Sequence, residues 1–463
     1  MPLSSISPID GRYRKSAEPL AQYFSEQSLM KYRLIVEGEY LIALSELKLK
    51  LRKLSDKEKK LVRSLYDLNE TDAQIISDIE FKGYKNIPST NHDVKAVEYY
   101  MKLKLSGSSL KDVLEWIHFA LTSEDTNNLA YALMLKNGIT DVLLPLLNEI
   151  IFSLTSQAQK YKDFPMLART HGQPASPTTF GKELRVFKER LLRQVENLKS
   201  QNILCKINGA TGNYNAHMAA YPKVDWPKFS QKFIESLSSN LKSSILNLKS
   251  NIATTQIEPH DSCIEIFDCL RRINNILIDF NQDTWRYISD GWIKQRAVKG
   301  EIGSSTMPHK INPINFENSE GNLGLANALF NHFAMKLPIS RLQRDLSDST
   351  VQRNFGTALG HCVVGYKYLI KGLAKIEPDP DKMLADLESH PEVVAEAIQT
   401  VLRREGAEMP YEKLKELTRG KKVEMADIEK FIDSLNVDAK IKKELKAFSP
   451  KTYTGLASKL AQK

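Results

Sequence analysis

Long runs of helix-type periodicity most constrain what this chain can fold into. In one run the apolar residues recur every three or four positions, at Phe180, Leu184, Phe187, Leu191, Val195 and Leu198. A second run does the same at Ile264, Phe267, Leu270, Ile273, Leu277 and Phe280. Such spacing places the apolar side chains on one stripe of a helix. Because both runs exceed the length of an average globular helix, they predict an all-α fold built on a bundle of long helices.

Further segments carry the same period, at 112–136, 319–336 and 349–374, while strand-type alternation is scarce. Asn137-Gly138 is expected to end the first of these helices, and Thr140 or Asp141 to cap the next. Two interruptions, at 106–109 and 377–380, suggest domain boundaries. They predict an N-terminal helical domain (1–108), a central long-helix bundle (109–376) and a C-terminal helical domain (377–463).

Composition narrows the class of protein. The 463 residues carry 65 Lys and Arg against 56 Asp and Glu, a net charge of +9. No basic motif interleaved with aromatic residues occurs. Most of this charge is therefore expected to lie on a solvated surface and not to bind nucleic acid. Four scattered cysteines are typical of reduced thiols, and no secretory segment or bilayer-length apolar run is expected. The prediction is a cytoplasmic protein with no nucleic-acid or membrane partner.

The segment 303–312, GSSTMPHKIN, concentrates unusual chemistry. Gly303 and Pro308 argue against a continuous helix through it. Its backbone N–H groups, with Lys310, could hold a carboxylate or a developing oxyanion. Ser304 and Ser305 could supply a nucleophile or a base. On chemistry alone, a solvated Ser/Thr loop is an equally good interpretation.

Several familiar catalytic and cofactor patterns are missing. The sequence has no P-loop, no dinucleotide-binding glycine motif, no nucleophile elbow and no His-Glu-x-x-His. His92 and His260, each followed by Asp, have no further ligands at metal-binding spacing. No metal and no cofactor is therefore expected.

The 303–312 segment resembles the signature loop of the fumarase/aspartase superfamily, G-S-S-x-M-P-x-K-x-N. Over nearly the whole chain, other segments resemble the bacterial adenylosuccinate lyase family: DGRY (10–13), NHDVKA (91–96), TSED (122–125), RTHGQP (169–174), TQIEPHD (255–261), RDLSDST (344–350) and YEKL (411–414). The resemblance implies a three-domain helical fold and a homotetramer with a merged helical core and shared active sites. It also implies elimination of fumarate from adenylosuccinate, giving AMP, and from succinylaminoimidazole-carboxamide ribotide, giving aminoimidazole-carboxamide ribotide.

The resemblance assigns catalytic roles to four residues. Ser304 would be the general base, with Ser305 the alternative because spacing cannot separate adjacent serines. His171, in a Gly/Pro turn, would be the general acid, with Glu317 orienting and charging its ring. Lys310 would oppose the charge of the carbanion intermediate. Without the resemblance, a lone His is more often structural, and Glu317 is an ordinary acid near a helix start.

The resemblance also assigns substrate contacts. The phosphate group of the substrate is expected to contact Arg12, Tyr13, Arg344, Ser349 and Arg353. The other expected contacts are Asn91, His92, Asp93, Thr122, Ser123, Gln256, Ser305, Lys310, Asn312, Asn318 and Thr350. Asn91 or Asp93 is also expected to cap the helix that follows, which is compatible with a role in the site.

Rival interpretations belong to other classes. One is a different superfamily lyase, such as argininosuccinate lyase, and the phosphate-contacting set argues against it. A second is a non-catalytic helical scaffold with a degenerate site, which would require the loss of a site residue. A third is a nucleic-acid-binding helical protein, which only the basic charge suggests.

Overall fold

The computed structural model describes residues 3–239, 244–296, 307, 310–419 and 423–462. Ser304 and Ser305, the predicted base and its alternative, lie outside the described residues. The chain divides into two compact units. The first comprises Met1–Leu147, Gln194–Asn275 and Gly321–Lys367, and the second comprises Asn148–Arg193, Ile276–Glu320 and Tyr368–Lys463. The division into three domains stays a prediction.

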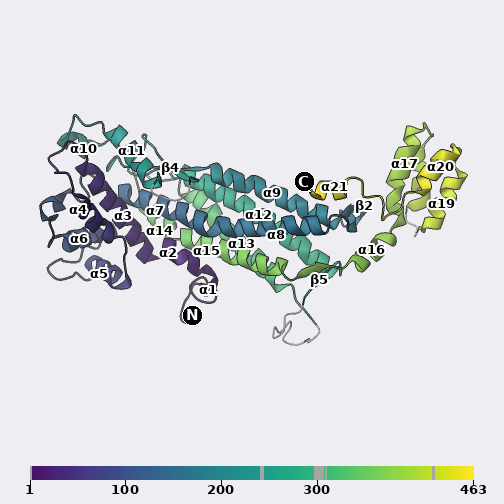
Figure 1. The fold of residues 1–463 in the computed structure, drawn as a ribbon, viewed down its shortest axis with the longest axis horizontal. Helices are drawn as coiled ribbons and strands as arrows, with labels where there is room; N and C mark the ends of the chain where they lie inside the picture. Colours follow the sequence, from purple (N-terminus) through teal and green to yellow (C-terminus); the bar gives the residue numbers. More distant parts are fainter. Residues whose placement is uncertain (1–2, 240–243, 297–306, 308–309, 420–422, 463) are drawn as a thin grey trace. The chain divides into compact units, whose positions relative to one another are not determined.

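Helices make up most of both units (Figure 1). Those within the first unit are α1 (Arg14–Ala17), α2 (Ala21–Phe24), α3 (Glu26–Ser45), α4 (Asp56–Ser64), α5 (Glu70–Phe81), α6 (Asp93–Leu105), α7 (Ser123–Gly138), α10 (Asn215–Ala220), α11 (Trp226–Ser239) and α14 (Ser347–Gln352). Those within the second are α16 (Pro380–Glu388), α17 (Ala395–Arg404), α18 (Pro410–Thr418), α19 (Met425–Ser434), α20 (Ala439–Lys446) and α21 (Ala457–Gln462). Helices contributing residues to both units are α8 (Leu144–Lys160), α9 (Phe180–Ser200), α12 (Asp261–Ser289), α13 (Ile314–Lys336) and α15 (Phe355–Leu373).

The strands are short and form two-stranded sheets. In the first unit, β3 (Asn202–Cys205) pairs in parallel with β4 (Asn247–Ser250). In the second unit, β1 (Pro165–Thr170) pairs antiparallel with β2 (Gln173–Thr179), and β5 (Ile293–Gln295) pairs antiparallel with β6 (Ile376–Pro378). The scarcity of strand-type alternation in the sequence is thus matched by the described structure.

The apolar stripes of the two long sequence runs face the protein interior. In α9, Phe180, Leu184, Phe187, Leu191, Val195 and Leu198 are all buried. In α12, Phe267, Leu270, Ile273, Leu277 and Phe280 are buried, and Ile264 is half-buried. Each such side chain stabilises the fold by about 1.5–3 kcal/mol relative to an exposed one. Burial of the stripes, rather than intrinsic helix propensity, is therefore the main reason that these helices form.

Helix α7 begins later than the prediction of a helix over 112–136. A short 3₁₀ helix covers Lys111–Trp116, and His118 has a left-handed backbone with φ of 60°. Thr122 and Asp125 then form a capping box, so the first helical residue is Ser123. The predicted start is wrong because the left-handed residue breaks the helical path after the 3₁₀ turn.

Helix α7 also continues beyond its predicted end. Gly138 has a helical φ of −62°, and a π-helical turn over Ile139–Leu143 leads directly into α8. A Cβ at Gly138 would lie 2.5 Å from Cε2 of Phe24, so the glycine makes room for that ring rather than ending the helix. The predicted stop at Asn137-Gly138 and the predicted cap at Thr140 or Asp141 are therefore wrong.

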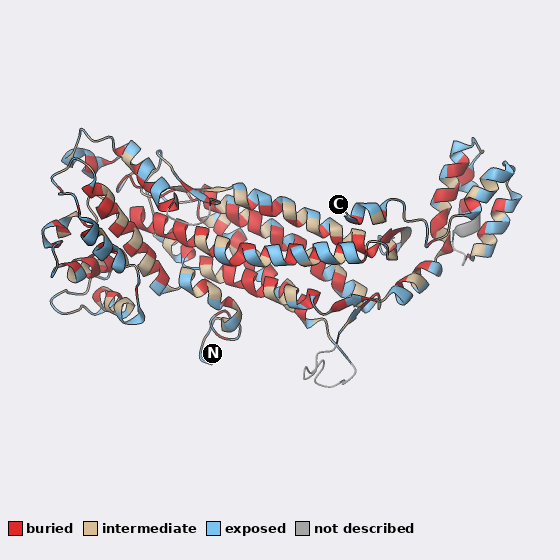
Figure 2. Cartoon of the chain, in the orientation of Figure 1, coloured by how far each residue is buried: buried red, intermediate tan, exposed pale blue. Residues whose placement is uncertain are grey.

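This continuity produces a long apolar helix. Within the described residues, Ser123–Lys160 is the one helix long and apolar enough to cross a membrane by length and composition, and half of its most apolar window is buried inside the protein. The expectation that no apolar run reaches this length is wrong, because the helix runs through Gly138. Figure 2 shows buried residues along nearly all of α7, as is typical of a core helix. The charged residues Glu124 and Asp125 are among the buried residues of this helix.

Candidate functional site

A network of buried charges fixes the start of α7, where Thr122 and Ser123 lie. Thr122 N donates to Asp125 Oδ2 at 2.9 Å, and Lys206 Nζ donates to Asp125 Oδ1 at 2.7 Å. The Asp125 and Lys206 side chains are fully buried, and Asn208 N donates a further bond of 3.0 Å to Asp125. A buried ion pair is tolerated only when its remaining polar atoms are bonded in this way. The network therefore holds Thr122 and Ser123 in fixed positions.

Gln256 belongs to the same network. Lys206 Nζ also donates to Gln256 O at 2.9 Å and to Gly209 O at 3.0 Å. The Gln256 side chain is half-buried and its Nε2 donates to Ala210 O at 3.1 Å. Lys206 thus connects Gln256 to Asp125, which in turn bonds Thr122 N. Of these residues, Gln256 and Thr122 belong to the predicted site.

His92 caps α6 and also contacts the start of α7. Its backbone is extended, its Nδ1 accepts from Lys95 N at 3.3 Å, and its Nε2 lies 3.2 Å from Ser123 Oγ. The prediction that Asn91 or Asp93 caps this helix is wrong: Asn91 has φ of 45°, and Asp93 is already the first helical residue. A neutral imidazole that accepts at Nδ1 carries its proton on Nε2. His92 can therefore donate to Ser123 or to an anion bound beside it.

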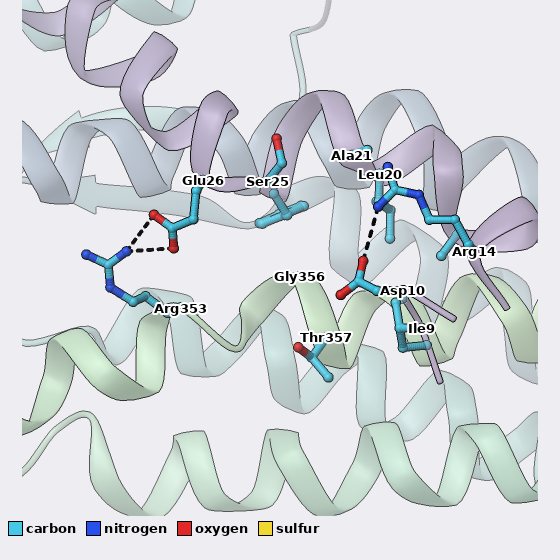
Figure 3. A pocket seen from close by; sticks show the side chains of 13 residues that line it. Ile9, Asp10, Arg14, Leu20, Ala21, Ser25, Glu26, Arg353, Gly356 and Thr357 are labelled. Carbon is cyan, nitrogen blue, oxygen red and sulfur yellow. Dashed lines mark hydrogen bonds and ion pairs between the residues drawn. The ribbon is translucent and has the colours of Figure 1, made fainter. Parts of the chain in front are cut away.

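Asp93 joins this helix start to Arg353. Its Oδ2 accepts from Arg33 Nη2 at 2.6 Å and from Arg353 Nη2 at 2.8 Å. Burial alone would raise the pKa of Asp93, but Arg33 and then Arg353 hold it below its ordinary value. Arg353 Nη1 also contacts both carboxylate oxygens of Glu26 at 2.7 Å, and Figure 3 shows the two side chains facing each other.

Arg353 and Glu26 line two cavities, of about 330 and 340 Å³. The first is also lined by Ile9, Asp10, Arg14, Ala17, Leu20, Ala21, Phe24, Ser25, Gly356, Thr357 and Gly360 (Figure 3). The second is also lined by Met30, Arg33, Ile76, Ser77, Glu80, Phe81 and Asp93. Such volumes suit small ligands. Arg12 and Tyr13, predicted phosphate contacts, lie in the chain between two residues of the first cavity.

Arg344 lies against two buried carboxylates beside the same end of α7. Its Nη2 is 3.2 Å from Glu124 Oε2, and its Nε is 3.5 Å from Asp348 Oδ2. Glu124 directly follows Ser123, which places Arg344 near the predicted substrate contacts Thr122 and Ser123. Glu124, Asp348 and buried His260 each bring one possible metal-ligand atom within 4.8 Å of the others. Because the Arg344 cation already adjoins both carboxylates, we interpret this group as a charge cluster.

The predicted acid, His171, lies in the second unit at the tip of the β1–β2 hairpin. His171 and Gly172 occupy the two turn positions, with φ of 54° and 74°. Left-handed backbone at both positions is the geometry of a type I′ turn. The His171 side chain is exposed and has no hydrogen-bond partner among the described residues. The hairpin thus presents this imidazole outward, as a proton donor to a bound molecule would require.

The other predicted catalytic residues with described positions are also in the second unit. Glu317 lies in the first turn of α13 and its Oε1 accepts from Trp285 Nε1 at 3.1 Å. No contact among the described residues joins Glu317 to His171, so their coupling stays a prediction. Lys310 is exposed. The remaining predicted residues of this unit are half-buried Asn312 and Asn318.

Comparison with known proteins identifies the family. The Lyase family model matches residues 11–327, and the Adenylosuccinate lyase C-terminal model matches residues 340–454. The chain belongs to the adenylosuccinate lyase family. It is 50% identical to the adenylosuccinate lyase of Vibrio cholerae over 465 residues, which cover 100% of this chain and 99% of that protein. It is 49% identical to that of Escherichia coli K12, over 98% of this chain and 97% of that protein. The chain is therefore a lyase.

Solved structures share its fold. The 3-carboxy-cis,cis-muconate lactonizing enzyme from Pseudomonas putida aligns with a TM-score of 0.71 at 18% identity, covering 96% of this chain and 95% of that one. A fumarate lyase from Mesorhizobium sp. BNC1 aligns with a TM-score of 0.71 at 16% identity, covering 96% of each chain. At these identities the likeness concerns the fold alone, and it confirms the predicted helical superfamily fold.

The structure adds residues that the sequence motifs did not single out. Glu26 and Glu124 both lie in the first turn of a helix, where an acid is readily explained as a favourable partner of the helix dipole. In the segment 122–125, however, Asp125 already fills the capping role. Glu124, an acid that the cap does not need, was therefore the sequence feature that could have marked this residue for the site. No local sequence feature connects Glu26 to Arg353.

Proposed function

We propose that this lyase cleaves adenylosuccinate to AMP and fumarate, and cleaves succinylaminoimidazole-carboxamide ribotide to aminoimidazole-carboxamide ribotide and fumarate, within purine nucleotide biosynthesis. The observation that carries the proposal is 50% identity to an adenylosuccinate lyase along the whole chain, together with the match to the C-terminal model of that family. Argininosuccinate lyase is not favoured, because relatives about 50% identical over nearly the whole chain are adenylosuccinate lyases.

In the proposed reaction, a base removes a proton from the substrate carbon beside a carboxylate. Ser304, as its alkoxide, is the proposed base, with Ser305 as the alternative. The C–H electron pair enters the carboxylate, and Lys310 with backbone N–H groups of 303–312 opposes the added charge. The pair then forms the C=C bond of fumarate as the C–N bond breaks, and His171 gives its proton to the departing nitrogen. Glu317 is proposed to orient His171.

The first unit supplies features suited to the anionic groups of such substrates. The N-termini of α6 and α7 meet through His92 and Ser123, and helix N-termini favour anions. We assign the succinyl carboxylates to Thr122, Ser123, His92, Lys310, Asn312 and Asn318. We assign the phosphate to Arg12, Tyr13, Arg344, Ser349 and Arg353. The remaining proposed contacts are Asn91, Asp93, Gln256, Ser305 and Thr350.

We further propose a cytoplasmic homotetramer whose active sites combine residues of neighbouring chains. His171 belongs to the second unit, whereas Ser123 and Arg344 belong to the first. A site containing all three residues requires the two units to meet, either within one chain or between chains. The superfamily resemblance favours the second arrangement.

Fumarate release tests the proposed function. Purified enzyme should release fumarate from adenylosuccinate, followed by absorbance, and not from argininosuccinate. Ser304→Ala and His171→Ala should each lose most of kcat while still binding AMP. Absence of fumarate release from either succinylated ribotide would overturn the proposed activity, and near-normal turnover by Ser304→Ala would transfer the role of base to Ser305.

Mixing experiments test the shared site. Inactive Ser304→Ala and His171→Ala chains, denatured together and refolded, should regain part of the activity, because some hybrid sites receive both intact residues. Mixed oligomers confirmed by native mass spectrometry but without activity would place both residues of a site on one chain.

A further inference from the structure

The cluster around Glu124 contains two carboxylates and one guanidinium in a nearly water-free environment. The side chains of Glu124 and Asp348 are 0% and 4% exposed, and that of Arg344 is 13% exposed. The Arg344 guanidinium lies within 3.2 Å of Glu124 and 3.5 Å of Asp348. Arg344 is one of the residues to which the proposed function assigns the substrate phosphate. The groups around Arg344 therefore control how it binds that phosphate.

The polar atoms of this cluster are incompletely satisfied. Both carboxylate oxygens of Glu124, Oδ2 of Asp348 and Nε of Arg344 are buried without an aligned hydrogen bond in the described part of the chain. Buried polar atoms are bonded in the great majority of cases, so unbonded ones call for an explanation. The ion contacts hold Arg344 near the carboxylates without fixing it in a bidentate pair. Its guanidinium is thus held in place yet retains capacity to bond another anion.

Other titratable groups face Glu124 from neighbouring elements. His260 packs against the cluster, and its Nε2 lies 3.2 Å from Gln352 Nε2. Burial lowers the pKa of His260 to about 4, so it is neutral at physiological pH. Lys206 and Asp125 also act on Glu124, but they form their own ion pair of 2.7 Å.

The charge balance of the cluster therefore depends on Glu124, Asp348 and Arg344. With both carboxylates ionised, the three groups carry a net charge of −1. Burial raises the pKa of Glu124, Arg344 lowers it and Asp348 raises it, and together these effects bring the pKa to about 7. A phosphate that approaches Arg344 adds negative charge and competes for the guanidinium. Both effects favour a proton on Glu124, whose pKa lies close to neutral pH.

We propose that Glu124 is a positioning residue that holds Arg344 for the substrate phosphate and takes up a proton when a phosphate-bearing ligand binds. The inference deepens the proposed function and rests on its assignment of the phosphate to Arg344. Glu124 itself touches no reacting atom in this scheme. It sets the orientation of Arg344 while the site is empty, and its protonation removes the competing charge when the site is filled.

Calorimetric titration with AMP tests the proton uptake. Heats measured at pH 7.5 in PIPES and in Tris, which have different ionisation enthalpies, give the number of protons exchanged. Wild-type enzyme should take up roughly 0.3–0.7 proton more than Glu124→Gln, whose neutral amide cannot titrate. The difference between the two proteins cancels any proton that AMP itself exchanges. Adenosine, which lacks the phosphate, should give no such difference.

A matched control and steady-state kinetics separate positioning from a general structural effect. Glu98 is a buried glutamate of α6 that pairs with Lys95 and Lys102, and Glu98→Gln should keep the wild-type proton count. Glu124→Gln should raise KM for adenylosuccinate roughly 5- to 20-fold while kcat changes less than about 3-fold. Equal proton counts in wild type and Glu124→Gln, or an unchanged KM in that variant, would overturn the proposal.

Two further measurements keep the test decisive. If Glu124→Gln does not fold, Asp348→Asn should reduce proton uptake, because removing the like charge lowers the proton affinity of Glu124. An unreduced proton count in Asp348→Asn would overturn the proposal.

AMP binding requires no turnover, so missing fumarate release overturns the proposed function alone. Missing proton uptake in an enzyme that releases fumarate overturns this inference alone.

Discussion

Replacing Lys206 by Met should destabilise the protein strongly, because it leaves the buried Asp125 carboxylate without its cation. Lys206 Nζ donates to Asp125 Oδ1 at 2.7 Å, to Gly209 O at 3.0 Å and to Gln256 O at 2.9 Å, and neither side chain of the ion pair is exposed. Methionine fills a similar volume, so the loss is mainly electrostatic. The substitution also removes the Lys206 donor from the two carbonyl groups, of which Gly209 O keeps a bond of 3.3 Å from Gly212 N.

The size of the loss follows from the bonds that remain. Removing one partner of a buried ion pair costs about 3–5 kcal/mol. Asp125 keeps N–H donors from Thr122, Asn208 and Gly209, which places the electrostatic loss at the lower end of that range. The loss of the Lys206 bonds to the two carbonyl groups adds about 1 kcal/mol. We therefore expect Lys206→Met to lower the free energy of unfolding by about 4 kcal/mol.

Urea unfolding at a fixed chain concentration, followed by circular dichroism, measures this loss. Lys136→Met is the matched control: Lys136 is a buried lysine of α7 whose pKa burial lowers, and it donates to Ile245 O at 2.6 Å. It should cost clearly less than Lys206→Met. Adding Asp125→Asn to Lys206→Met should recover about 1–3 kcal/mol, because no buried charge then lacks a partner. Equal losses in the two lysine variants, or a double variant that shows the sum of its single losses, would refute the reasoning.

Two further predictions concern stability. Gly212→Ala should lower the free energy of unfolding by more than about 2 kcal/mol, because φ is 77° and the new Cβ would lie 2.1 Å from Thr254 O. Thermal melting measures the loss, and the control Gly107→Ala, whose Cβ would have no atom within 4 Å, should show little change. Glu37→Gln should lower the free energy of unfolding most between about pH 4.5 and 6.5. The lowered pKa of Glu37 stabilises the fold above pH 4.5, and the raised pKa of its partner His118 stabilises the fold below pH 6.5. The loss should shrink as the pH rises through the His118 pKa, and melting curves in which it grows with pH would contradict this.

The long helices could be predicted because their signal is local. The stripes of α9 and α12 are written in residues three or four positions apart, and each stripe is buried as its period indicates. The boundaries of α7 could not be predicted, because distant residues decide them. Gly138 would suit a helix end, but Phe24 packs against it, and the left-handed turn at His118 is held by a bond of 2.6 Å to Glu37.

For the site, the motifs named residues and the structure provided their partners. The resemblance placed His92, Ser123 and Arg353 in one site, and the structure joins His92 to Ser123 directly. It could not indicate that Arg353 pairs with Glu26, since 327 positions separate the two residues. Nor could spacing show that His92 itself caps α6, because histidine is an uncommon cap and its neighbours Asn91 and Asp93 are common ones.

These partners change how the basic charge of the protein should act on its substrate. Arg353 is already paired with Glu26 and Asp93, and Arg344 already adjoins Glu124 and Asp348. A phosphate bound at these arginines, as proposed, would therefore replace one set of anions with another, and the broken carboxylate contacts would offset part of the new ones. Such exchange keeps the arginines oriented before the ligand arrives while limiting the net gain in binding. An enzyme that must release a phosphate-bearing product as well as capture a phosphate-bearing substrate benefits from that limit, because a site of unpaired arginines would bind both too tightly.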